Sequence, residues 1–172
     1  LMMATTPHTT ELIGSDRFEL HPDDEAAILR EMEHYEQPQA ACIEALKIVQ
    51  RRHGWVPDGA IMAIGRLLGL GFAAVDGVAT FYSLIFRQPV GRHVILVCDS
   101  SSCFLTGYET LKQALVEKLG VDYGATTADG RFTLLPVCCL GACDGAPALM
   151  IDGETFGPVT PEDLSDLLEG YE

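Results

Sequence analysis

The sequence is short of basic side chains. Its 172 residues contain 11 Lys and Arg against 25 Asp and Glu, which gives a formal net charge of −14. A field of that sign repels the phosphate backbone of nucleic acids, so we expect no nucleic-acid partner. From Asp144 to the end of the chain no Lys or Arg occurs. This asymmetry fits either an acidic face that keeps the protein in solution or a basic partner surface.

Long apolar runs are also missing. No run approaches the roughly 20 residues that cross a bilayer, because glycines and Asp76 interrupt the two longest candidates, residues 61–70 and 73–86. The first residues, 1–6, show neither the basic start and apolar stretch of a secretory signal nor the arginines of a transit peptide. We therefore expect a soluble, cytoplasmic protein that has no membrane span of its own.

Motifs of nucleotide binding and covalent catalysis are absent as well. No G-x-G-x-x-G follows a predicted strand, and neither a phosphate loop nor a serine nucleophile elbow occurs. The Cys-x-x-Cys motif is absent, which argues against a dithiol redox centre. We therefore expect no nucleotide site and no catalytic side chain on this chain alone.

Hydrophobic residues make up 48% of the sequence, enough for the core of one ordinary domain or of two small ones. Residues 1–20 show no periodicity, and we expect them to form a flexible N-terminal lead-in. Residues 21–91 contain four short stretches of helical periodicity, three of which start at or next to Pro22, Pro38 and Pro57. The second is expected to end at Gly54. This pattern predicts a small helical bundle.

Residues 92–172 alternate between strand and helix patterns. The expected elements are strands at 93–97 and 131–137, a helix at 106–120 between them, a hairpin that turns at Asp152-Gly153, and a last helix from Thr160. Thr106 and Glu109 have the spacing of a capping box at the start of the first of these helices. The order β-α-β-β-β-α predicts an α/β domain.

Four of the six cysteines form two pairs, and each pair begins where a predicted strand ends. The pairs are Cys98 with Cys103 and Cys139 with Cys143. A strand–helix–strand crossover joins parallel strands, so both pairs are expected at the carboxyl edge of one sheet. Clustered cysteines in a reducing compartment indicate metal or redox chemistry. Four thiolates at one point therefore favour a [2Fe–2S] cluster.

Other interpretations of the cysteines stay open. A structural zinc site would make the chain an interaction module without redox activity, and the gaps within the two pairs permit it. Structural disulfides are disfavoured in a cytoplasmic protein. We expect Cys138 to be a plain buried thiol, because adjacent residues that leave a strand point to opposite faces. Cys42 lies on the apolar face of a predicted helix and is expected in the core.

The sequence resembles a family of thioredoxin-like [2Fe–2S] ferredoxin subunits, the E subunits of bacterial NADH:quinone oxidoreductase (respiratory complex I). The resemblance covers about residues 21–170. Its most specific stretches are Gly54-Trp55-Val56-Pro57, Val78 to Tyr82, Pro89-Val90-Gly91, Cys98 to Cys103, Gly130 to Pro136, and Cys139 to Cys143. It implies a thioredoxin-like [2Fe–2S] domain over residues 92–172 after a helical bundle over 21–91. The family's four cluster ligands fall on Cys98, Cys103, Cys139 and Cys143.

The resemblance also implies the role of an electron-transfer subunit within an ion-translocating oxidoreductase. The cluster would lie beside the FMN of a partner flavoprotein subunit that also binds NADH. Residues 78–82 and the helical bundle would supply much of that interface, in the peripheral arm of complex I on the cytoplasmic face of the inner membrane. No quinone site is expected on this chain. The alternatives are the same module in an NAD-linked hydrogenase or formate dehydrogenase, and a free-standing dimeric ferredoxin.

Overall fold

The computed structural model describes residues 18–171, and the chain divides into two compact units after Pro89. Most of the lead-in predicted over residues 1–20 lies outside the described residues. Phe18 and Leu20, at its end, pack against the core of the helical unit. Each unit has a hydrophobic core of its own.

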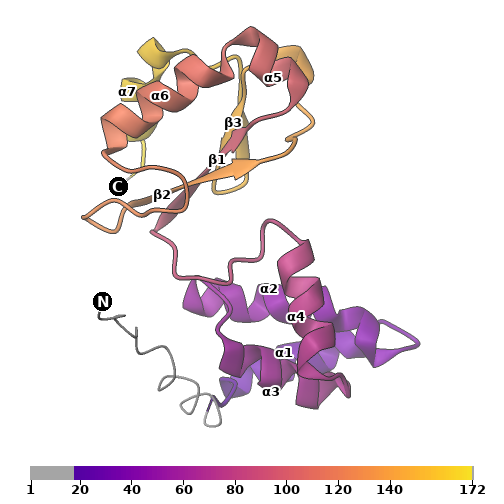
Figure 1. Ribbon diagram of the computed structural model, residues 1–172. Helices are drawn as coiled ribbons and strands as arrows, with labels where there is room; N and C mark the ends of the chain where they lie inside the picture. The colour runs from indigo at the N-terminus through magenta and orange to yellow at the C-terminus, as the bar shows by residue number, and fades with distance from the viewer. Residues whose placement is uncertain (1–17, 172) are drawn as a thin grey trace, which may run out of the picture. The chain divides into compact units, whose positions relative to one another are not determined.

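In the described part of the first unit, every regular element is a helix (Figure 1). Its elements are α1 (Pro22–Met32), η2 (Pro38–Ala41), α2 (Cys42–His53), α3 (Asp58–Leu68) and α4 (Phe72–Phe81). As predicted, Pro22 occupies the start of α1, and α2 ends at Gly54 in the left-handed region, with φ of 78°. Cys42 is buried in the core, which confirms the prediction for this thiol.

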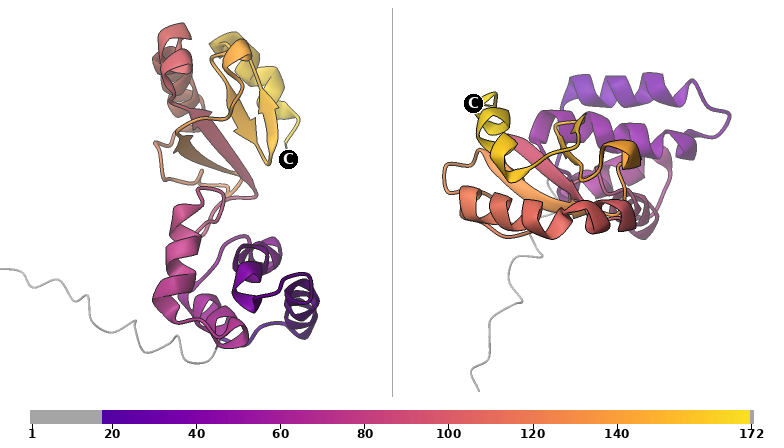
Figure 2. Two further views of the ribbon diagram at one scale, coloured as in Figure 1. Left: turned by 90° about the vertical axis from the view of Figure 1, so that its right-hand side faces the viewer. Right: turned by 90° about the horizontal axis from the view of Figure 1, so that it is seen from above.

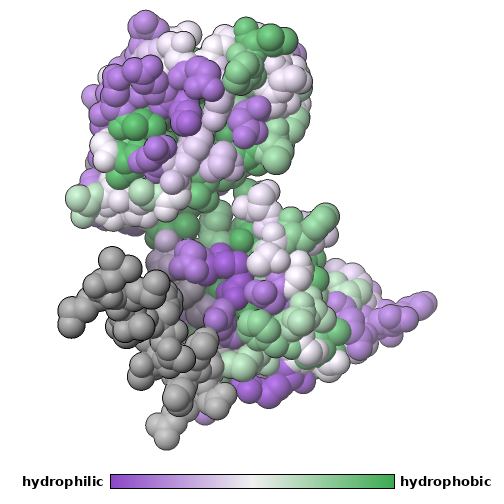
Figure 3. Space-filling model, in the orientation of Figure 1, coloured by the Kyte–Doolittle hydropathy of each residue, from purple (hydrophilic) through white to green (hydrophobic). Residues whose placement is uncertain are grey.

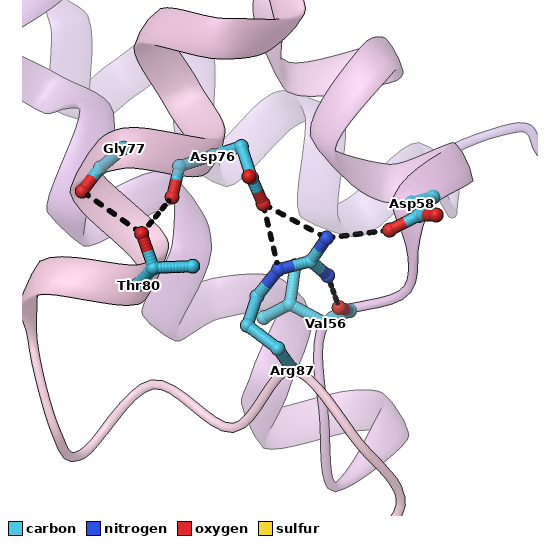
Figure 4. A network of polar contacts seen from close by, with 6 residues as sticks. All are labelled: Val56, Asp58, Asp76, Gly77, Thr80 and Arg87. Atoms are coloured by element: carbon cyan, nitrogen blue, oxygen red, sulfur yellow. Dashed lines mark hydrogen bonds and ion pairs between the residues drawn. The ribbon is translucent and has the colours of Figure 1, made fainter.

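Two arginines tie the helices of this unit together. Arg52 of α2 donates two hydrogen bonds to the nearly buried carboxylate of Asp24 on α1. Arg87 reaches back from the segment after α4 to Asp76 of α4, to Asp58 at the start of α3, and to the carbonyl oxygen of Val56 (Figure 4). One guanidinium group therefore holds α3, α4 and the segment before α3 in place.

Within the described part of the chain, no single helix is long and apolar enough to cross a membrane. Helices α3 and α4 meet the length and composition of a span only as a pair, and the pair is bent by 117° at its connection.

The second unit is built on a four-stranded mixed sheet. Its elements are β1 (His93–Cys98), α5 (Ser101–Thr106), α6 (Tyr108–Leu119), β2 (Phe132–Val137), η3 (Cys143–Gly145), β3 (Leu149–Ile151), β4 (Glu154–Phe156), η4 (Pro161–Asp163) and α7 (Leu164–Glu169). The strand order is β2-β1-β3-β4, in which β1 and β2 are parallel and the other neighbours antiparallel. The predicted parallel pairing is confirmed.

Helices pack along this sheet (Figures 1 and 2). Helix α6 lies beside η4 and α7, and Lys118 Nζ donates to Ser165 Oγ over 2.7 Å. Residues 95–97 and 134 at the centre of the sheet are almost fully buried. The antiparallel hairpin turns at Asp152-Gly153, both at positive φ, as the sequence predicts.

The predicted capping box at Thr106 and Glu109 is wrong. The helical region contains a break at Gly107, whose φ of 129° is outside the range of a helix. Thr106 is the last residue of α5, and its hydroxyl donates to the carbonyl oxygen of Ser102 over 2.8 Å. The crossover between β1 and β2 therefore contains two helices, of which the shorter carries a cysteine of the first pair.

Candidate functional site

Two cysteine-bearing loops leave the sheet at the same edge. Cys98 is the last residue of β1 and pairs with Val137, the last residue of β2. The N–H group of Asp99 donates to the carbonyl oxygen of Val137 over 3.0 Å, which continues the pairing beyond the strands. Since the strands are parallel, the loops that follow them start side by side.

The two pairs differ in exposure. Cys98 and Cys103 are 3% and 1% exposed. They belong to the core of the second unit, together with Tyr108. Cys139 and Cys143, from the loop after β2, are exposed. The site therefore has a buried half, held by the β1 end and α5, and an open half.

The pKa shifts of two thiols link the two cysteine pairs. The pKa of the Cys139 thiol is lowered by the Gly141 N–H group first, and the side chains of Ser100, Cys143 and Cys98 lower it further. Burial raises the pKa of the Cys103 thiol, and Cys98 and Cys143 raise it further. The electrostatic surroundings of Cys139 and of Cys103 thus each include Cys98 and Cys143, as expected for two loops that start at the same sheet edge.

A backbone donor points at one of these sulfur atoms. The N–H group of Gly141 donates to Cys139 Sγ over 3.3 Å. Gly141 has a φ of 76°, a conformation that a residue without Cβ adopts at little cost. A thiolate that accepts a backbone hydrogen bond is stabilised in its charged form, which is the form that binds a metal.

Two tyrosines, Tyr108 and Tyr123, pack in the same core as the buried thiols. The Tyr123 hydroxyl donates to the Tyr108 hydroxyl over 3.2 Å, and the ring of Phe104 lies 6.2 Å from that of Tyr108. Burial and the Tyr108 hydroxyl raise the pKa of Tyr123, so this phenol stays protonated. The Tyr108–Tyr123 pair was not predicted, since nothing in the spacing of two tyrosines 15 residues apart indicates contact.

The prediction for Cys138 is wrong. Cys138 is exposed, not buried. The alternation of faces applies within a strand, whereas β2 ends at Val137 and Cys138 lies in the bend that follows. Cys138 and Cys139 are therefore both accessible to solvent.

Across residues 18–171, no group of three or more His, Cys, Asp or Glu side chains takes the arrangement of a metal site. The assignment of Cys98, Cys103, Cys139 and Cys143 as cluster ligands stays a prediction. The donor set fits an iron–sulfur cluster in kind, because it offers four thiols and a backbone N–H group directed at sulfur.

The sheet order and the crossover define a thioredoxin-like α/β protein. The family described as thioredoxin-like [2Fe-2S] ferredoxin matches residues 28–172, and the chain belongs to this family. Its cofactor is accordingly a [2Fe–2S] cluster. The fold class and the family predicted from the sequence are both confirmed.

Two relatives match almost from end to end. The chain is 60% identical over 162 residues to the E subunit of the NADH-quinone oxidoreductase of Pseudomonas aeruginosa, and the match covers 94% of this chain and 98% of the relative. It is 56% identical over 164 residues to the corresponding subunit from Escherichia coli K12, with 95% and 99% covered.

A solved structure also matches the fold. The crystal structure of an NAD+-reducing [NiFe]-hydrogenase in the H2-reduced state aligns with a TM-score of 0.62 at 23% identity. The alignment covers 72% of this chain and 21% of the hydrogenase chain. At this identity the likeness shows the fold alone.

Proposed function

We propose that the chain is an electron-transfer subunit of an NADH:quinone oxidoreductase and carries one [2Fe–2S] cluster on Cys98, Cys103, Cys139 and Cys143. The observation that carries this proposal is the identity of 60% to the E subunit of such an enzyme, over 98% of the relative's length. The start of both cysteine-bearing loops at one sheet edge supports the ligand assignment.

The residues of this chain have distinct tasks at the site. When bound, the cluster supplies one-electron transfer at a potential that its surroundings set. Cys98 and Cys103 anchor the buried half from rigid elements, β1 and α5. Gly141 donates its N–H group to Cys139 Sγ, and such hydrogen bonds to sulfur tune the potential. Tyr108, which accepts a hydrogen bond from Tyr123, packs in the same core as Cys98 and Cys103.

The partner in this proposal is a flavoprotein subunit that binds FMN and NADH, within the peripheral arm of the complex at the cytoplasmic face of the membrane. An exposed apolar surface beside the site supports the docking of a partner there. Phe104 and Leu105 of α5 are 56% and 84% exposed, and Figure 3 shows a hydrophobic area over α5. Such side chains next to a redox site are typical of an interface.

The helical unit offers a second apolar surface. Phe81, Tyr82 and Leu84, at and after the end of α4, are 80%, 44% and 52% exposed. They overlap the region 78–82 that the resemblance assigns to the flavoprotein interface. The proposal therefore gives both units a share in binding the partner.

A test of this proposal starts from the chain purified without oxygen. We expect two iron and two acid-labile sulfide per chain, a red-brown colour, and a rhombic EPR signal from one unpaired spin after reduction with dithionite. Mixed with the flavoprotein subunit of a related complex, the chain should form a stable pair whose cluster NADH reduces. A colourless chain with one zinc and no sulfide would overturn the electron-transfer function and support the zinc-stabilised module.

A further inference from the structure

The segment that follows Cys143 is held from two sides. On one side, the N–H group of Cys98 donates to the carbonyl oxygen of Ala148 over 3.1 Å. On the other side, the N–H group of Val159 donates to the carbonyl oxygen of Pro147 over 2.9 Å. Residues 145–148 are therefore confined between the end of β1 and the loop 157–159, which joins β4 to η4.

The backbone of Gly145, in this segment, lies in close contact with the backbone of Gly157, in the loop. A Cβ atom on Gly157 would lie 2.1 Å from the carbonyl oxygen of Gly145, far inside van der Waals contact. A Cβ atom on Gly145 would lie 3.1 Å from the carbonyl group of Gly157. Neither glycine has a positive φ, so glycine is required here by the close approach of two chain segments and not by a backbone conformation.

We propose that Gly157 is a positioning residue for the [2Fe–2S] site: the loop 157–159 acts as a backstop that fixes how far Cys143 lies from Cys98 and Cys103. This inference rests on the proposed function. Gly145 is two residues from Cys143 and belongs to the same short helix, η3. A methyl group at position 157 has to displace Gly145. The hydrogen bond from the Cys98 N–H group to the Ala148 carbonyl oxygen resists a shift of residues 145–148 past the end of β1.

Such a displacement would change the positions of the cysteine thiols relative to one another. Cys143 interacts with both Cys103 and Cys139, so a shift of η3 changes the spacing between the buried and the open halves of the site. Outer residues that orient ligands typically change metal retention by about 10–100-fold when they are altered. Strand β2, which leads to Cys139, lies on the other side of β1 from this segment.

The test compares three alanine variants of the complete chain. Gly157→Ala carries the severe contact and Gly145→Ala the milder one. Gly170→Ala is the control, since its Cβ would meet nothing closer than 3.6 Å and its φ is that of a helix. After reduction with dithionite, the g values of the cluster are recorded by EPR, and the loss of visible absorbance to an iron chelator is timed.

We expect altered g values and a cluster release roughly 10-fold faster for Gly157→Ala, a smaller change in the same direction for Gly145→Ala, and none for Gly170→Ala. A variant that is merely less stable would give fewer clusters with the wild-type spectrum. That result, or a wild-type spectrum and release rate in Gly157→Ala, would overturn the positioning role.

Two further outcomes are separated by the same experiment. If Gly157→Ala does not fold, the milder Gly145→Ala decides the question by its g values. If the wild-type chain binds no [2Fe–2S] cluster, the proposed function itself is overturned, and this inference with it.

Discussion

Asp24 and Arg52 form a two-point ion pair between helices α1 and α2. Arg52 Nε lies 2.6 Å from Asp24 Oδ2, and Arg52 Nη2 lies 2.9 Å from Asp24 Oδ1. The Asp24 side chain is 9% exposed. The hydrogen bonds from Arg52 are the main cause of a lowered pKa at Asp24, and they outweigh the opposing effect of burial.

This pair predicts a pH dependence of stability. A carboxyl group with a lowered pKa in the folded state stabilises the fold above its ordinary pKa, and the contribution disappears as the pH falls through the lowered value. The Asp24→Asn variant should therefore unfold at lower urea concentration than wild type at neutral pH, with a difference that shrinks as the pH falls below the ordinary pKa of an aspartate, about 4. The measurement is urea unfolding at neutral and at acidic pH, monitored by circular dichroism.

The control for this prediction is Asp23→Asn. Asp23 is the neighbouring carboxylate, but its side chain is 82% exposed and lies 4.0 Å from Arg52, so its replacement should leave the unfolding midpoint almost unchanged. An equal loss of stability in Asp24→Asn at neutral and at acidic pH would show that charge is not the cause.

A second prediction concerns Arg87. Its guanidinium group is the donor to the carbonyl oxygen of Val56, whose residue is fully buried. Arg87→Met keeps much of the side-chain volume but leaves that oxygen and Asp76 without their donor. The free energy of unfolding of the helical unit should fall by about 1–3 kcal/mol, measured by urea unfolding. Replacing only the exposed partner, as in Asp58→Asn, should cost about 0.5 kcal/mol or less.

The ligand assignment predicts the outcome of a cysteine series. Cys98→Ser, Cys103→Ser, Cys139→Ser and Cys143→Ser should each lose or strongly perturb the cluster, because each removes one of four thiolates. Cys138→Ser is the matched control, since Cys138 is exposed like Cys139 and adjacent to it. Iron and sulfide content and EPR provide the measurement. A bleached Cys138→Ser beside an intact Cys139→Ser would reverse the assignment of the two neighbours.

The docking surface on α5 predicts a separation of binding from cluster content. In Leu105→Glu, the cluster and its EPR signal should be retained, because the Leu105 residue is 84% exposed. The affinity for the flavoprotein subunit should fall about 10-fold, as expected when an apolar anchor at an interface becomes charged.

The control is Thr155→Glu, which adds the same charge at an exposed residue of β4, in the same unit as α5. Affinity is measured by titration with the purified flavoprotein subunit. Equal losses of affinity in Leu105→Glu and Thr155→Glu would indicate a general effect of charge and would remove α5 from the interface.

The sequence predicted the parts of the fold that follow from local patterns. The apolar run 93–97, the Asp152-Gly153 turn and the glycine at position 54 each specify their structure over a few residues. The parallel pairing of β1 and β2 also followed, because a strand–helix–strand order permits little else.

What could not be predicted depends on where elements end and on contacts between segments distant in sequence. Thr106 and Glu109 have the spacing of a capping box, but the box does not form, because α5 ends at Thr106 and α6 starts only after Gly107. Cys138 is exposed because β2 ends one residue before it. The contact between Gly145 and Gly157 leaves no trace in the composition of either segment, as both positions have only the pattern of turn glycines.

Because the two cysteine pairs are unequally buried, the site has one side closed to solvent and one side open to it. Cys98 and Cys103 are sealed into the core, whereas Cys139 and Cys143 are open to solvent. If the proposed ligands are correct, iron and sulfide would enter the newly folded chain past the second pair, and oxygen and chelators would attack from the same side. Assembly of the chain into its complex would therefore be the step that protects the cluster, and a chain left without its partner would lose iron from the Cys139–Cys143 half first.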